Sequence, residues 1–198
     1  MIARATGLVI ALLLHASMAG AADNGGSFAV KDVGLSRCAD YTDAVKTKNE
    51  AQMGRYVGWL GGFLTAANQR LPETFDLTPW QNSRTLAVYL ANHCGKNPEL
   101  RFGAAVVQLS AALHEDRLRE KSDLIPIEHG GQTHFVYREA LRRTQAALAD
   151  LGMYSGNLDG TFNEATRTAL KAYQAQKSLP DTGMPDQDTL FRLLQQDG

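Results

Sequence analysis

The stretch that decides the fold is Leu-Gly-Met-Tyr-Ser-Gly-Asn-Leu-Asp-Gly-Thr-Phe-Asn-Glu-Ala-Thr at 151–166, followed by Ala-Leu-Lys-Ala-Tyr-Gln at 169–174 and Asp-Thr-Gly at 181–183. Leu141 and Leu148 precede it at helical spacing, and Gly152 follows at a position where glycine commonly ends a helix. The pattern therefore predicts a first helix over 137–151 with a long, tight turn behind it.

Two further helices are expected after that turn. Asn163 is a good capping residue for a second helix, which should end near Lys177. Asp186 can cap a third helix, which carries several leucines on one face. Three short helices are thus expected to pack around one small core.

The order of these elements resembles the peptidoglycan-binding domain family over 137–194. Asn163 stands where that family usually has glycine, and asparagine serves both the left-handed backbone region and the capping of a helix. The resemblance implies non-covalent binding of peptidoglycan in the cell wall.

Peptidoglycan offers flat sugar faces and stem peptides with carboxylates and amides. Aromatic rings suit the first, while an arginine fork or turn N–H groups suit the second. The expected ligand-binding residues are Tyr154, Asp159, Gly160, Thr161, Arg167, Tyr173 and Gln174. The alternative interpretation is structural, because residues at helical spacing form a core and Asp-Gly pairs shape turns.

The N-terminus has the pattern of a secretory signal peptide at 1–21. One basic residue, Arg4, precedes an apolar run over 8–14, and small residues follow. Cleavage is expected after Ala21 or Ala22, and the run is too short for a membrane span of about 20 residues. The protein is therefore expected to be periplasmic or secreted.

Composition limits the function classes. The 198 residues include 20 basic and 21 acidic ones, so the formal net charge of -1 gives no basic patch for nucleic acid. The length leaves room for two domains, and Pro126 with Gly130-Gly131 favours a linker between them. We therefore expect a helical domain at 22–122, a linker at 123–134 and a small module at 135–198.

The chain has two cysteines, Cys38 and Cys94. Both lie in the part expected to be exported, where oxidising conditions preserve disulfides, so a structural bond between them is predicted. A catalytic thiol is the rival interpretation. A second pair that could form a zinc site is missing from the sequence.

The expected N-terminal domain has helix-start signals at Thr78-Pro79-Trp80-Gln81 and Asn97-Pro98-Glu99. They predict helices to about His93 and about Arg119. An apolar helix over 50–69 contains four glycines, which predict close approach of another helix. The whole chain is accordingly expected to be all-α: a disulfide-bonded helical bundle followed by a three-helix module.

One disulfide, the Gly-Trp-Leu-Gly-Gly-Phe-Leu segment at 58–64 and a helix ending at Cys94 are similar to small helical exported proteins of the HdeA type and the Tai immunity type. The resemblance covers 38–113 and implies binding of a protein partner, as a chaperone or as an inhibitor. No functional residue is carried over from it.

The sequence contains no recognisable catalytic motif. His114-Glu115-Asp116 is expected to be a solvated helix end, and His129 with His134 is a poor metal site. The sequence therefore predicts a binding protein, not an enzyme, with no metal and no cofactor. A part of a wall-hydrolysing enzyme is the weakest alternative.

Overall fold

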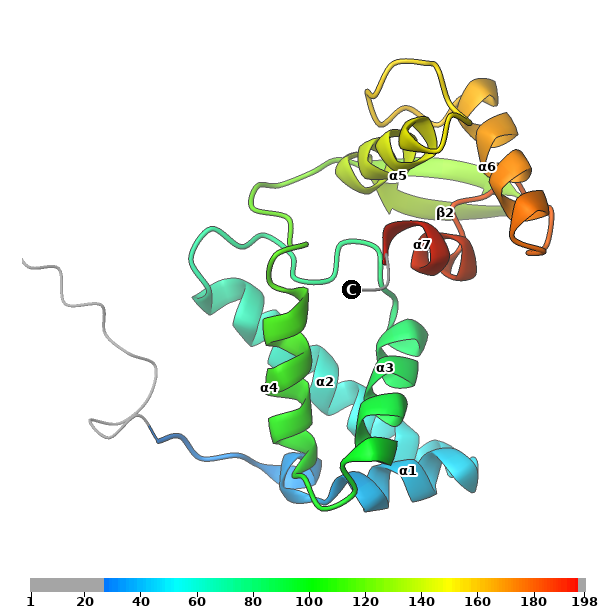
Figure 1. The fold of residues 1–198 in the computed structure, drawn as a ribbon. Coiled ribbons are helices and arrows are strands. Elements are labelled where there is room, and N and C mark those ends of the chain that lie inside the picture. The colour runs from blue at the N-terminus through cyan, green and yellow to red at the C-terminus, as the bar shows by residue number, and fades with distance from the viewer. Residues whose placement is uncertain (1–26, 196–198) are drawn as a thin grey trace, which may run out of the picture. The chain divides into compact units, whose positions relative to one another are not determined.

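The computed structural model describes residues 27–195, so the expected signal peptide and its cleavage sites lie outside the described residues. Residues from Lys31 onward form one compact unit. Its elements are η1 (Asp32–Leu35), α1 (Cys38–Lys46), α2 (Glu50–Arg70), α3 (Ser83–Lys96), α4 (Phe102–Leu113), β1 (Leu124–His129), β2 (Gln132–Tyr137), α5 (Arg138–Asp150), α6 (Glu164–Gln176) and α7 (Gln187–Leu194) (Figure 1). Within this range no helix combines the length and the apolar character needed to span a membrane.

Three aromatic rings form the centre of the N-terminal helices. Tyr41 of α1, Tyr56 of α2 and Phe102 of α4 are buried, and their ring centroids lie 4.7 to 4.9 Å apart. The Tyr41 hydroxyl donates a hydrogen bond to the Ala87 carbonyl in α3. One aromatic cluster thus holds all four helices together.

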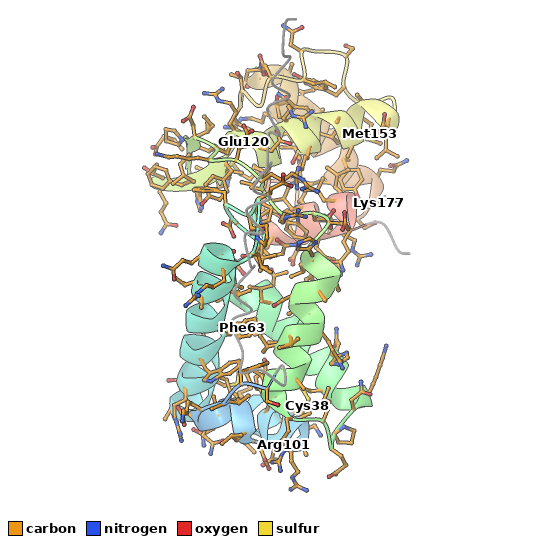
Figure 2. All side chains as sticks on the ribbon, turned by 90° about the vertical axis from the view of Figure 1, so that its left-hand side faces the viewer. Cys38, Phe63, Arg101, Glu120, Met153 and Lys177 are labelled. Atoms are coloured by element: carbon orange, nitrogen blue, oxygen red, sulfur yellow. A yellow bond between two sulfur atoms is a disulfide. The ribbon has the colours of Figure 1, made fainter. Side chains whose placement is uncertain are left out.

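The predicted disulfide is confirmed. Cys38, the first residue of α1, is bonded to Cys94 near the end of α3, and both cysteines are fully buried. Figure 2 shows Cys38 at the same end of the helices as Arg101, while Phe63 lies farther along α2. The bond therefore fixes one end of the helical bundle.

Both expected helix starts in this region are wrong. Helix α3 begins at Ser83, where Asn82 accepts a hydrogen bond from the Thr85 N–H, and the stretch from Thr78 lies outside it. Trp80 is buried there against Ala140 and Leu190. Burial of this large ring and the stronger asparagine cap override the proline signal.

The second start is displaced in the same way. Asn97 donates its N–H to the carbonyls of His93 and Cys94, so it closes α3 and does not open α4. Helix α4 starts only at Phe102 and ends at Leu113, not near Arg119. The residues that follow α4 instead run beside Asp76, which forms an antiparallel bridge with Leu118.

The glycines of α2 do not mark a helix contact. A Cβ atom built on Gly54, Gly58, Gly61 or Gly62 would meet nothing within 4 Å. The expectation of a close neighbouring helix was therefore wrong, because these glycines lie on the exposed face of α2.

The chain is not strictly all-α. The segment expected to be a linker contains an antiparallel hairpin, in which β1 pairs with β2 around Gly130 and Gly131, both at positive φ. A two-residue turn with positive φ at both positions suits the twist of paired strands. Ile127 is buried against Leu141 and Met184, so the hairpin packs on the C-terminal helices (Figure 1).

The three C-terminal helices occur as predicted. Helix α5 ends at Asp150, and Gly152 follows with a φ of 71°. Asn163 caps α6 through the Thr166 N–H, and Asp186 caps α7 through the Thr189 N–H. We refer to residues 137–194 as the C-terminal module.

Replacing Asn163 by alanine is expected to lower the free energy of unfolding of the C-terminal module by about 1 kcal/mol, because the Thr166 N–H loses its acceptor. Chemical denaturation followed by circular dichroism measures the change. Asn157 is an exposed turn residue whose replacement by alanine is the matched control. An equal loss in both variants would contradict the capping role.

Candidate functional site

A buried glutamine organises the long turn of the C-terminal module. Gln145 of α5 is fully buried, and its Oε1 accepts a hydrogen bond of 2.8 Å from the Gly160 N–H. Its Nε2 donates to the Thr161 carbonyl at 2.9 Å and to the Thr166 hydroxyl at 3.1 Å. The side chain thus clamps the turn onto the start of α6.

A second glutamine repeats this arrangement one helix later. Gln174 of α6 is also fully buried, and its Oε1 accepts from the Gly183 N–H at 2.8 Å. Its Nε2 donates to the Met184 carbonyl at 3.0 Å and to the Thr189 hydroxyl at 2.9 Å. The module therefore contains two equivalent glutamine clamps, each closing a turn before a helix.

Each clamp requires glycine at its centre. Gly160 and Gly183 have φ values of 69° and 63°, in the region that favours glycine. A Cβ atom on Gly160 would lie 2.2 Å from the Arg138 carbonyl oxygen. The packing of the turn thus requires glycine at position 160. This agrees with the structural interpretation of the sequence, in which Gly160 shapes the turn.

Four of the expected ligand-binding residues are buried. Tyr173 and Gln174 face the interior, Gly160 lies in the first clamp, and the Tyr154 hydroxyl donates to the Asn157 carbonyl at 3.0 Å. Only Asp159, Thr161 and Arg167 of the expected set keep solvent-accessible side chains. The structure thus divides the expected residues into a scaffold and a small exposed group.

Asp159 and Thr161 form an exposed turn. The Thr161 N–H donates to Asp159 Oδ1 at 2.8 Å, and this hydrogen bond is the main cause of the lowered pKa of the Asp159 carboxyl group. Asp159 is therefore ionised at neutral pH. A carboxylate at this position can accept hydrogen bonds from ligand hydroxyl or amide groups.

Arg167 lies beside the same turn. Its guanidinium carbon is 4.8 Å from the centre of the Phe162 ring, and its nearest acid, Glu164, is 4.0 Å away. The stacking on Phe162 and a hydrogen bond from Nη1 to the Met184 sulfur orient the guanidinium group, whose other N–H groups can donate to a ligand carboxylate. Phe162 was not expected as a site residue, because an isolated aromatic residue in a turn gives no periodic signal.

Two hollows border the module. One, of about 330 Å³, lies between the turn at Tyr154 to Gly156 and the first half of α6. The other, of about 560 Å³, lies between 115–123 and α5. In the second hollow, Arg142 and Arg143 both pair with Glu139, and these hydrogen bonds, chiefly that of Arg142, lower the pKa of the Glu139 carboxyl group.

The remaining polar clusters have structural partners. Arg117 is buried and donates to the carbonyls of Glu73 and His114, while Glu115 is largely exposed beside His114. His129 and His134 lie in the hairpin. Over residues 27–195, no group of three or more His, Cys, Asp or Glu residues is arranged to hold a metal ion.

Comparison with known proteins finds similarity in the C-terminal module. Residues 137–193 match the family model described as "Putative peptidoglycan binding domain". No solved structure matches the chain. The match begins at the last residue of β2 and ends in α7, so it contains both glutamine clamps.

Two curated relatives share a segment of similar size. The chain is 48% identical over 52 residues to "Putative OxPP cycle protein OpcA" of Synechococcus elongatus, covering 26% of this chain and 12% of that protein. It is 47% identical over 49 residues to "Localization factor PodJL" of Caulobacter vibrioides, covering 25% of this chain and 5% of that protein. The chain thus spans only a small part of either relative, and the likeness concerns one module.

Proposed function

We propose that the protein holds peptidoglycan non-covalently through residues 137–193 and acts outside the cytoplasmic membrane. The family match to this segment carries the proposal and supports a cell-wall-binding role. The exposed group Asp159, Thr161 and Arg167 is the proposed contact surface, in which Asp159 and Thr161 lie on a turn that the Gln145 clamp holds rigid and Arg167 lies beside it in α6. A prearranged surface loses little entropy on binding.

The proposed mechanism is tethering. A wall polymer repeats the same chemical unit, so a weak site can rebind after each dissociation and raise the local concentration of the attached helices. Helices α1 to α4, which correspond to the proposed domain 22–122, would thereby be kept at the wall. The buried disulfide supports an oxidising compartment, where such bonds persist.

The test is cosedimentation of the full chain with purified peptidoglycan sacculi. The pelleted fraction is expected to rise with protein concentration and to saturate, and soluble wall fragments are expected to compete. Insoluble cellulose is the matched control polymer, because it offers sugar faces without stem peptides. Equal pelleting with both polymers, or with neither, would overturn the proposal.

A non-catalytic role has its own readout in the same samples. The turbidity of the wall suspension is expected to stay constant for hours after addition of the protein, because binding alone cleaves no bond. A steady fall in turbidity, with release of soluble fragments, would instead indicate a hydrolase.

A further inference from the structure

A third hollow, of about 590 Å³, lies between the first half of α3 and α7, and is of a size typical for small-ligand sites. Its lining includes Arg84, Val88, Tyr89, Pro180, Phe191 and Arg192. It combines residues from the N-terminal helices with residues from the C-terminal module. We call it the α3/α7 groove.

The side chain of Gln187 joins the walls of the groove by hydrogen bonds. Gln187 Oε1 accepts from the Asn82 N–H at 2.8 Å and from the Thr85 hydroxyl at 2.7 Å, and Nε2 donates to the Trp80 carbonyl. Beside these bonds, the buried Trp80 ring packs on Leu190. The two sides of the groove are therefore fixed relative to each other.

The floor of the groove is apolar. The rings of Tyr89 and Phe191 lie 5.7 Å apart, and Val88 and Phe191 are 51% and 41% exposed. The Tyr89 hydroxyl is hydrogen-bonded to Gln195, and burial, with a smaller effect from the Asp116 charge, raises the Tyr89 pKa to about 12. The floor is thus neutral at physiological pH and can cover the aliphatic groups of a ligand.

Three charged side chains at the rim of the groove are available to a ligand. Among the described residues, Arg84 and Arg192 form neither an ion pair nor a hydrogen bond, and the same holds for the Asp188 carboxylate. Asp186, by contrast, is occupied in capping α7. Guanidinium groups bind carboxylates by paired, charge-assisted hydrogen bonds, so the rim suits a ligand with carboxylates and an amine.

We propose that the α3/α7 groove binds the stem peptide of the cell wall. Its carboxylates would lie on Arg84 and Arg192, an amine on Asp188 and small aliphatic groups on Tyr89 and Phe191. The glycan lacks this combination of charges. The inference rests on the proposed function and deepens it, because it names the peptide as the ligand and makes α3 part of the site.

The test measures affinity by calorimetry with soluble muropeptides from muramidase-digested sacculi. Replacement of Arg84 and Arg192 by glutamine in the full chain is expected to weaken binding by about tenfold for each arginine. Arg70→Gln is the matched control, because Arg70 is also exposed and has no partner within residues 27–195, but lies at the end of α2. All four arginine variants, two single, one double and the control, should keep the thermal unfolding temperature of the parent chain.

Two ligand controls accompany the variants. Muropeptides with amidated carboxylates are expected to bind at least tenfold more weakly, and the peptide-free glycan is expected not to bind. Unchanged affinity of the Arg84→Gln, Arg192→Gln double variant would overturn the groove. Equal affinity for the peptide-free glycan would overturn the peptide as ligand. Binding of neither muropeptides nor sacculi by the parent chain would overturn the proposed function itself.

Discussion

Replacing Gln145 by leucine is expected to lower the free energy of unfolding of the C-terminal module by about 3 kcal/mol. Leucine fills a similar volume but leaves the buried Gly160 N–H without its acceptor and removes a donor to the Thr161 carbonyl. Because domains are stable by only 5 to 15 kcal/mol, and small ones by less, the loss would unfold a large part of the module near body temperature.

Urea denaturation followed by circular dichroism measures this loss, and hydrogen exchange in α6 assigns it to the module. Gln176→Leu is the matched control, since Gln176 lies on the exposed face of α6, the helix whose Thr166 hydroxyl accepts from Gln145. Cosedimentation with sacculi should fall in parallel with the folded fraction. A Gln145→Leu variant as stable as the parent chain would contradict the clamp.

The elements that local chemistry specifies were predictable from sequence. Helices α5, α6 and α7 follow from leucine spacing, from a glycine stop and from Asn163 and Asp186, each of which acts within four residues of its partner. The disulfide followed from the presence of only two cysteines. Such features need no knowledge of distant contacts.

The elements that were not predicted depend on distant partners. Thr78 has a capping-box sequence, but Trp80 is held by Leu190 of α7, more than a hundred residues away in the chain. The hairpin did carry a local signal, since Gly130-Gly131 follows a run with alternating Ile125 and Ile127, but Pro126 and the glycine pair favour a linker on sequence alone. Glycines indicate either flexibility or a specific turn, and only the flanking alternation distinguishes the two.

In the candidate site, too, local features were predictable from the sequence and distant contacts were not. Sequence identified the turn at Asp159 to Thr161 and favoured a core position for Tyr173, but it could not show that the polar Gln174 also faces inward. One feature of the sequence could have indicated the role of Gln145: it is a polar residue on the apolar face defined by Leu141 and Leu148. The α3/α7 groove left none, because its two sides are joined only by tertiary contacts such as that of Gln187 with Asn82.

Reduction of the bond between Cys38 and Cys94 is expected to lower the free energy of unfolding of the N-terminal helices by about 4 kcal/mol, the value of the chain-entropy model for a loop of this length. The two cysteines are 56 positions apart, and the loop between them contains all of α2 and most of α3. Opening it frees a large part of the unfolded chain while the native contacts of Tyr41, Tyr56 and Phe102 remain.

Urea denaturation with and without a thiol reductant compares the two states of one sequence, so no cavity is introduced. Trp59 is a suitable fluorescent reporter, because it stacks on Phe63 and contacts Phe102 in the N-terminal core. Hydrogen exchange in α6 serves as the internal control and should change little. An unchanged urea midpoint would mean that the aromatic cluster alone holds these helices, and the disulfide would no longer support an oxidising compartment. The expected fall in the midpoint would mean that stable folding of these helices depends on such a compartment.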